Sequence, residues 1–282
     1  MKPDLDQLRH PLGLHQLGYA APLLEHAATR WEGGQATPSR EVVAEEVPVA
    51  IAYNGLAHVV MMATPSDLED FGLGFSLTEE LVRTRADVRS IEAVRYSRGI
   101  ELQLTVSEAC EAEIQARNRR LTGRTGCGIC GAGSVESVLR PVRRVEAPGP
   151  VAASAVGRAL QQLPQLQPLN SAAGAVHAAA WADREGNVAL VREDVGRHNA
   201  LDKLIGALAG AGTDPADGFI VVTSRASFEM VQKATVFGVP LLAAISGATG
   251  LAIRVAEEAG LTLAGFVRGD RLTVYTRPDR LR

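Results

Sequence analysis

The sequence predicts a mixed α/β protein with a small α+β part in its first half and an α/β part in its second half. Two apolar, β-prone runs flank Asn54-Gly55, a dipeptide that favours a tight hairpin turn. Beyond residue 188, strand-sized apolar runs alternate with helical apolar stripes, as in α/β sheets. Three prolines over residues 141–150 indicate a boundary between these parts. We therefore expect an extended or partly disordered arm over residues 1–40, with a polar linker at 33–40, a small α+β domain over 41–140 and an α/β domain over 151–282.

The first half contains two strand pairs around one helix. Residues 47–53 and 57–62 form the predicted hairpin strands, and residues 91–96 and 101–105 form two more. Ser66 with Glu69 three residues later is typical of a capping box, which predicts a helix start. The helix would present an apolar face that includes Phe71 and Phe75.

The second half alternates strands and helices. Strands are predicted over residues 188–191, 219–222, 239–245, 261–267 and 271–275. Between them, an apolar stripe over 201–208 predicts a helix, and glycines at 238 and 260 end two more helices over 228–237 and 251–259. This pattern is typical of a sheet with parallel strands.

Composition excludes several classes of function. The net charge of −3 leaves no overall basic field for nucleic acid. Among the 282 residues, no apolar run reaches the roughly 20 residues needed to span a bilayer, so we expect no membrane segment. Three cysteines and the absence of an apolar signal segment indicate the cytoplasm rather than a secreted disulfide framework.

Cys127 and Cys130 are the most informative residues, because two thiols three positions apart in a glycine-rich run can bind a metal, cycle through a disulfide or carry sulfur. Positive charge nearby favours the reactive thiolate and could attract an anionic ligand, although a solvated basic surface is an equal alternative. The arginines concerned are Arg117, Arg119, Arg120, Arg124, Arg140, Arg143 and Arg144.

The sequence supports the three possible chemistries of the thiol pair to different degrees. A structural zinc site needs four ligands and the chain has no second Cys-x-x-Cys, while none of the six histidines begins the His-x-Glu of a zinc deaminase. A dithiol redox site has the right spacing, yet such sites usually open a helix in a thioredoxin-like fold. Sulfur transfer needs a mobile thiolate beside an acceptor site.

An acceptor site is predicted where two strands meet helices, over residues 193–203 and 223–230. Both loops combine an arginine with short polar side chains at a helix start, which suits an anion. The alternative is that Asn199, Ser224 and Ser227 only cap helices.

Three segments, 125–131, 193–203 and 224–234, together resemble the formate dehydrogenase accessory protein (FdhD) family, and the likeness runs from about residue 47 to the C-terminus. The resemblance implies a sulfurtransferase that takes sulfur from a cysteine desulfurase and passes it to the molybdenum bis(molybdopterin guanine dinucleotide) cofactor for formate dehydrogenase. It also implies a homodimer and a C-terminal αβα layered domain of cytidine-deaminase-like fold. A non-catalytic cofactor-binding chaperone is the alternative.

The resemblance also implies site residues. Cys127 would carry the persulfide, with Cys130 as its companion. The segment that contacts the cofactor would comprise Phe266, Val267, Arg268, Gly269, Asp270 and Arg271.

Overall fold

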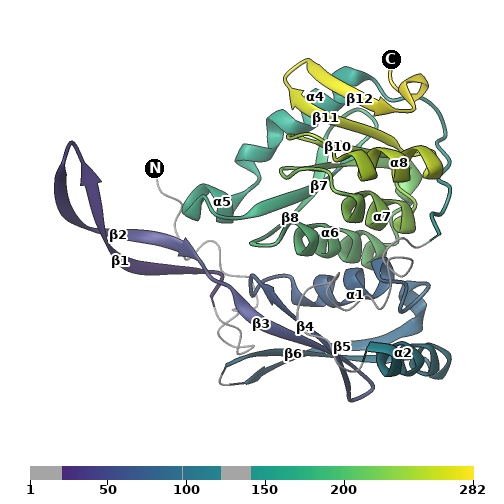
Figure 1. Cartoon of the computed structure of the whole chain (residues 1–282), viewed down its shortest axis with the longest axis horizontal. Coiled ribbons are helices and arrows are strands. Elements are labelled where there is room, and N and C mark those ends of the chain that lie inside the picture. Colours follow the sequence, from purple (N-terminus) through teal and green to yellow (C-terminus); the bar gives the residue numbers. More distant parts are fainter. Residues whose placement is uncertain (1–20, 97, 122–140) are drawn as a thin grey trace.

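The computed structural model describes residues 21–96, 98–121 and 141–282. The described elements stack in layers (Figure 1). A helix, a six-stranded sheet and a row of three helices form the upper part, and one helix joins this row to a four-stranded sheet below. A two-stranded hairpin extends to one side.

The six-stranded sheet has the order β12-β11-β10-β9-β7-β8. Its central strands β9, β10 and β11 are parallel, and β7 lies antiparallel to both β8 and β9. Because two antiparallel steps restore direction, β8 runs the same way as β9. The strand bounds are β7 (His177–Asp183), β8 (Val188–Asp194), β9 (Gly218–Val222), β10 (Leu241–Ala244), β11 (Thr262–Arg268) and β12 (Arg271–Thr276).

Helices cover both faces of this sheet. One face packs against α6 (Arg197–Ala211), α7 (Phe228–Phe237) and α8 (Gly250–Ala259), because each presents an apolar stripe to β-strand side chains. The other face packs against α4 (Ala153–Gln162). Gly212, Gly238 and Gly260 end the three helices of the row in the left-handed conformation that glycine adopts most easily.

The four-stranded sheet has the order β4-β3-β6-β5, and α1 (Leu68–Thr78) covers one of its faces. Asn54 and Gly55 both have positive φ, 48° and 81°, as the predicted hairpin turn requires. The strands are β3 (Val47–Tyr53), β4 (Leu56–Ala63), β5 (Val88–Tyr96) and β6 (Gly99–Val106), and α2 (Glu108–Leu121) follows β6.

Glycines allow α1 to cross α6 closely. A Cβ built on Gly206 would lie 2.8 Å from the amide nitrogen of Gly74, and one built on Gly74 would lie 2.8 Å from the amide nitrogen of Gly206. Only residues without side chains fit this crossing. The crossing joins the small sheet and its helix to the large sheet.

Several elements complete the fold. The lateral hairpin pairs β1 (Leu23–Glu32) with β2 (Gln35–Ala44) and turns at Gly33-Gly34. The remaining α-helix of the described chain is α5 (Pro168–Ala173). Short 3-10 turns occupy η1 (Arg85–Asp87), η2 (Leu163–Gln165), η3 (Pro215–Asp217) and η4 (Pro278–Arg280).

The mixed α/β prediction is confirmed, and so are the hairpin about Asn54-Gly55 and α7 with Gly238 at its end. The capping box is wrong: the helix begins after Asp67, which has a φ of 50° and makes no side-chain cap, and the buried Ser66 hydroxyl has no hydrogen bond to the described residues. The division into domains at 41–140 and 151–282 stays a prediction.

The expected arm needs correction between residues 21 and 40. The polar linker at 33–40 is instead the turn and most of the second strand of the β1–β2 hairpin, because two glycines at positive φ supply a type I′ turn. Residues 1–20 lie outside the described part. Sequence reasoning missed β7, whose alanine run lacks alternation, and α2, α4 and α5. None of the helices in the described ranges is long and apolar enough to cross a membrane.

Candidate functional site at the carboxyl edge of the large sheet

The carboxyl ends of four strands lie at one edge of the large sheet. Strands β8, β9, β10 and β11 run in the same direction, and α6, α7 and α8 begin just after the first three. In open α/β sheets this edge is where ligands bind, because helix N-termini present free N–H groups there. We call it the carboxyl edge.

A fully buried carboxylate shapes the first loop of the carboxyl edge. Asp194, at the end of β8, accepts hydrogen bonds from the backbone N–H of Gly196 at 2.7 Å and of Thr64 at 2.9 Å. The side chain of Asn199 donates to it at 3.0 Å, and the Lys203 ammonium forms a buried ion pair with it at 2.7 Å. These bonds fix the start of α6 and tie it to the end of β4.

The fixed loop leaves hydrogen-bonding groups without partners. Gly196 precedes α6 and supplies no side-chain cap, and the buried Nε of Arg197 makes no hydrogen bond to the described residues. Ser227 precedes α7, and its buried Oγ likewise has no hydrogen-bond partner there. Buried donors at two helix N-termini are costly unless a ligand or water satisfies them. They form a suitable site for an anion.

Two histidines lie among these groups. Nε2 of His198, at the start of α6, is 3.0 Å from Oε2 of Glu229 in α7, an ion-pair distance without hydrogen-bond geometry. The interaction with His198 lowers the pKa of Glu229, so this carboxylate is ionised at neutral pH. Partial burial lowers the pKa of His177, at the start of β7, and the guanidinium of Arg197 lowers it further. His177 is therefore neutral at pH 7.

Phe266 borders the third loop of the carboxyl edge. Its φ of 51° is unusual for a bulky residue, its N–H donates to the Ser246 carbonyl at 3.1 Å, and its side chain is 55% exposed. A Cβ at Gly247 would lie 2.7 Å from the ring, so the ring packs on this glycine. An exposed aromatic ring on a glycine backbone offers a flat surface for a planar ligand.

The predicted segment 266–271 divides into parts. Arg268 joins Phe266 at the loop after β10, since its Nη1 donates to the Ile245 carbonyl at 2.7 Å. The Val267 side chain points the other way into the core against α4. Gly269 and Asp270 form the turn between β11 and β12, and Arg271 opposes Arg268 across it. A cofactor-binding role for these residues stays a prediction.

Cys127 and Cys130 lie outside the described residues, as do Arg124 and Arg140. Two of the flanking arginines have partners in the described part: Arg117 donates to the Glu79 carbonyl at 2.7 Å, and Arg143 pairs with Glu80 at 3.1 Å. The third cysteine, Cys110, is buried in the small core. No group of His, Cys, Asp or Glu within the described ranges could hold a metal ion, and the zinc alternative for the Cys pair stays untested.

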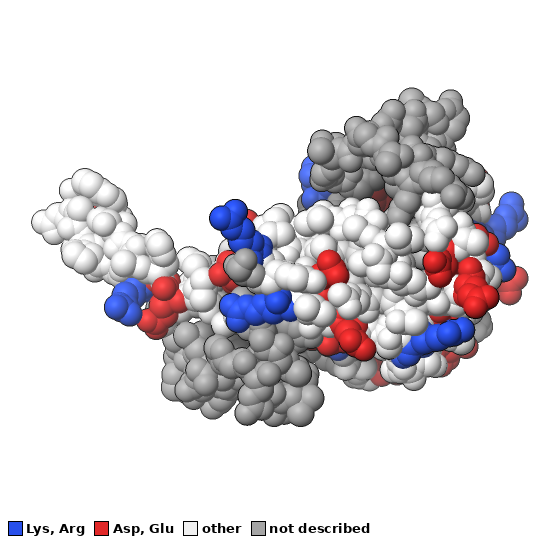
Figure 2. Space-filling model, turned by 90° about the horizontal axis from the view of Figure 1, so that it is seen from below, with Lys and Arg blue, Asp and Glu red and all other residues white. Residues whose placement is uncertain are grey.

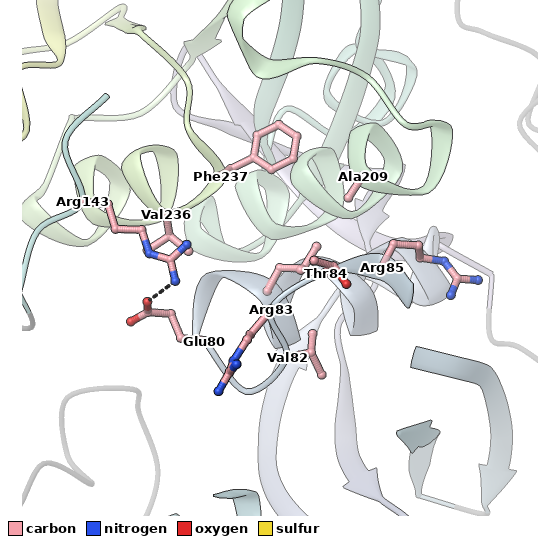
Figure 3. A pocket seen from close by; sticks show the side chains of 10 residues that line it. Glu80, Val82, Arg83, Thr84, Arg85, Arg143, Ala209, Val236 and Phe237 are labelled. Atoms are coloured by element: carbon pink, nitrogen blue, oxygen red, sulfur yellow. Dashed lines mark hydrogen bonds and ion pairs between the residues drawn. The ribbon is translucent and has the colours of Figure 1, made fainter. Parts of the chain in front are cut away.

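A pocket of about 210 Å³ lies away from the carboxyl edge, near the opposite ends of α6 and α7 (Figure 3). Val236 and Phe237 from α7 and Ala209 from α6 line one side, and Arg83 lies among the residues opposite. The Glu80–Arg143 ion pair spans part of its rim. The charge of Arg143 is thus balanced by Glu80, and that of Arg83 by Glu113 at 3.1 Å.

Sequence reasoning selected both loops but missed how they are built. It did not predict the buried ion pair of Asp194 with Lys203 or the contact of His198 with Glu229. Lys203 could have been noticed because a lysine within an apolar helical stripe needs a buried partner. His177 carried no signal, since the strand that it opens was not predicted.

Comparison with known proteins identifies the relatives of this fold. A sulfur carrier protein FdhD from Bordetella petrii is 49% identical over 280 residues, 99% of each chain, and one from Variovorax paradoxus is 53% identical over 88% of this chain and 89% of its own. The crystal structure of a putative formate dehydrogenase accessory protein from Desulfotalea psychrophila has the same fold, with a TM-score of 0.73 and 22% identity over 92% of this chain and 99% of its own. Residues 44–282 match the FdhD/NarQ family. The chain therefore belongs to the FdhD/NarQ family.

Proposed function

We propose that this protein is a sulfurtransferase that accepts sulfur from a cysteine desulfurase as a persulfide on Cys127 and passes it to the molybdenum bis(molybdopterin guanine dinucleotide) cofactor of formate dehydrogenase. The observation that carries the proposal is the naming of the relatives as sulfur carrier proteins at 49% and 53% identity over most of the chain, together with the Cys127–Cys130 pair. Cys130 assists Cys127.

The loading step needs only a thiolate and a donor persulfide. The thiolate of Cys127 attacks the outer sulfur of the donor's persulfide, a new S–S bond forms, and the donor cysteine leaves as a thiolate. No external oxidant is required, because one S–S bond replaces another. Arginines before and after the pair, such as Arg124 and Arg140, would favour the thiolate that this attack requires.

The carboxyl edge is the proposed place for the cofactor, which is a substrate of the reaction. Its pyrophosphates carry the negative charge that the N-termini of α6 and α7 and the unpaired Nε of Arg197 would satisfy. The exposed ring of Phe266 would stack on a planar base, and Arg268 lies beside it. The described residues therefore fit a dinucleotide.

The finer features of the proposal follow from the same family membership. We expect the protein to act in the cytoplasm, where a persulfide carrier and its desulfurase meet, and to act as a homodimer. We also expect the layers of the C-terminal part to correspond to a cytidine-deaminase-like fold. Helices on both faces of the large sheet support this expectation.

Sulfur loading is tested by anaerobic incubation with a cysteine desulfurase and cysteine, followed by intact-mass measurement. We expect one added sulfur that reduction removes and that Cys127→Ala abolishes. Cys110→Ala is the matched control, because Cys110 is buried in the small core and should leave loading unchanged. Equal loading of Cys127→Ala and wild type would refute the assignment of Cys127.

The cofactor site is tested by titration with GDP. Replacing Arg268 and Arg271 by Gln should weaken GDP binding and leave sulfur loading unchanged. Unchanged affinity would remove this segment from the site. If no variant and no wild-type protein gains sulfur while GDP still binds, the protein is a cofactor-binding chaperone rather than a sulfurtransferase.

A further inference from the structure

A carboxylate lies among the groups that would attract an anion to the carboxyl edge. Glu229 is in the first turn of α7, two residues after Ser227, whose buried Oγ has no hydrogen-bond partner among the described residues. Its Oε2 is 3.0 Å from Nε2 of His198 in the first turn of α6. The helix N-termini attract a pyrophosphate, whereas a negative charge beside them repels it. The site therefore contains one group that opposes its proposed ligand.

The other carboxylates that follow β8 or end it have fixed partners. Asp194 is buried in its ion pair with Lys203 at 2.7 Å. Glu193 accepts hydrogen bonds from two backbone N–H groups at the start of α5, both at 2.9 Å. Glu229 differs from both, because its partner is a histidine, the side chain whose charge changes near neutral pH.

A second contact between the same two helices uses a permanent charge instead. Asp202 lies one turn after His198 on α6, and Lys233 lies one turn after Glu229 on α7. These two residues form a buried ion pair at 2.9 Å. The cation inside the interface is thus a lysine, whereas the cation at the edge is a histidine whose side chain is 27% exposed. The titratable cation lies where a ligand from solvent would reach it.

The charges around His198 act in opposite directions. Glu229 of α7 favours its protonation, and the preceding guanidinium of Arg197 opposes it. From β7, His177 lies close enough to interact electrostatically with both Arg197 and His198, but it is neutral at pH 7. Lys233 is already paired with Asp202. An anion bound to Arg197 would remove the opposition, so its binding would favour the imidazolium of His198.

Long-range charge does not supply the attraction for an anion. The net charge of the chain is −3. On the face that Figure 2 shows, acidic and basic side chains of the described residues are interspersed rather than gathered by sign. The affinity for a pyrophosphate therefore depends on local groups, where one charge more or less has a large effect.

On the basis of the proposed cofactor site, on which this inference rests, we propose that His198 and Glu229 make binding of a pyrophosphate at the carboxyl edge proton-linked. With His198 neutral, the carboxylate of Glu229 repels the ligand. With His198 protonated, the pair is neutral, and Arg197 and the two helix N-termini determine the affinity. The site therefore takes up a proton as it binds the nucleotide and releases the nucleotide more readily as the pH rises.

Two substitutions in this one contact should change the affinity for GDP in opposite directions. Glu229→Gln removes the repelling charge and should tighten binding about fivefold at about pH 9, where a histidine is neutral. His198→Asn leaves Glu229 unopposed, so it should weaken binding about fivefold at about pH 6 and by less than about twofold at about pH 9. A merely structural contact would instead make both variants bind more weakly.

Isothermal titration calorimetry measures these constants. Comparing each variant with wild type at the same pH removes the effect of the ionisation of GDP itself. Far-UV circular dichroism checks that each variant is folded, and His198→Gln replaces His198→Asn if the latter is not.

The same calorimetry counts protons when the titration is repeated at about pH 7.5 in buffers of different ionisation enthalpy. Wild type should take up more protons per bound GDP than His198→Asn. His26→Asn is the matched control, because His26 is exposed on β1 in the lateral hairpin and should leave proton uptake and affinity unchanged. Loss of the uptake in His177→Asn but not in His198→Asn would assign the proton to the other imidazole and overturn the proposal.

Unchanged or weaker GDP binding by Glu229→Gln at about pH 9, or equal proton uptake by wild type and His198→Asn, would also overturn it. These outcomes differ from failure of the proposed cofactor site. If GDP does not bind, or if Arg197→Gln binds it as tightly as wild type does, the site itself is rejected and the proton linkage with it. Sulfur loading of Cys127, measured by mass on the same samples, should not depend on either variant.

Discussion

The crossing of α1 and α6 predicts a large stability difference between two glycines one turn apart on the same helix. A Cβ on Gly206 would lie 2.8 Å from the amide nitrogen of Gly74 and closer still to the carbonyl oxygen of Asp70, whereas ordinary contact begins at 3.4 Å. A Cβ on Gly210 would meet only the end of the Leu73 side chain, at 4.0 Å. Gly206→Ala and Gly210→Ala therefore introduce the same methyl group into different surroundings.

The two substitutions should act in opposite directions. The atoms that obstruct Gly206 belong to the backbone of α1 and cannot rotate away, so the helices must separate at a cost of about 3 kcal/mol, the upper part of the range for overpacking. Gly210→Ala meets no such obstacle and should gain up to about 1 kcal/mol from the better helix propensity of alanine.

Urea unfolding followed by circular dichroism measures both free energies of unfolding. We expect Gly206→Ala to lower the midpoint and Gly210→Ala to raise it slightly, with unchanged slopes. Equal stability of the two variants would refute the close helix crossing. A lower slope for Gly206→Ala would indicate that the two halves of the molecule unfold separately.

Three further predictions concern the carboxyl edge. Arg197→Gln should weaken GDP binding about tenfold or more in a calorimetric titration, because it removes a charge from two helix N-termini; an unchanged constant would exclude Arg197 from the site. The pKa of Glu229 is lowered in the fold, so its contact with His198 stabilises the fold fully above about pH 4.5, the ordinary pKa of a glutamate, and this stability is lost as the pH falls through the lower folded value. Glu229→Gln should flatten this part of the pH profile of the free energy of unfolding. An unaltered profile would contradict the contact of Glu229 with His198. Thr64→Val leaves the Val195 N–H without its 3.1 Å acceptor, so it should lower the free energy of unfolding by about 1–3 kcal/mol and also weaken GDP binding. Thr78 is equally buried but lies next to Asp202, so Thr78→Val should lower stability alone. Equal effects of the two variants on GDP binding would contradict this distinction.

Local signals predicted the elements whose periodicity and turn residues agree. Asn54-Gly55 determined one hairpin, and Gly238 and Gly260 ended α7 and α8, because positive φ favours glycine and asparagine at such positions. Gly33-Gly34 carries the same signal, but the strands beside it contain charged residues on both faces, which made them resemble a linker. An unpacked ribbon lacks the apolar alternation by which strands are recognised.

The candidate site was predictable only in outline. The arginines and short polar residues after two strands indicate a ligand, since strand ends meet at one edge of a parallel sheet. The sequence cannot show that β7 inserts antiparallel between β8 and β9 and thereby brings His177 beside Arg197. Strand order depends on long-range packing, which no local pattern encodes.

The buried charges explain why the two sheets act as one support for the carboxyl edge. Lys203 on α6 donates to the Thr64 carbonyl at 2.9 Å and pairs with Asp194, so the end of β4 in the small sheet holds the loop before α6. Along the same helix interface, Lys233 of α7 pairs with Asp202 at 2.9 Å and donates to Thr78 of α1 at 2.9 Å. Each lysine is buried, so separating the layers would leave a buried charge without its partner. Losing one partner of a buried ion pair costs about 3–5 kcal/mol. The small sheet is therefore part of the scaffold that positions Arg197, since Asn199 also donates to the Met62 carbonyl of β4 at 2.8 Å.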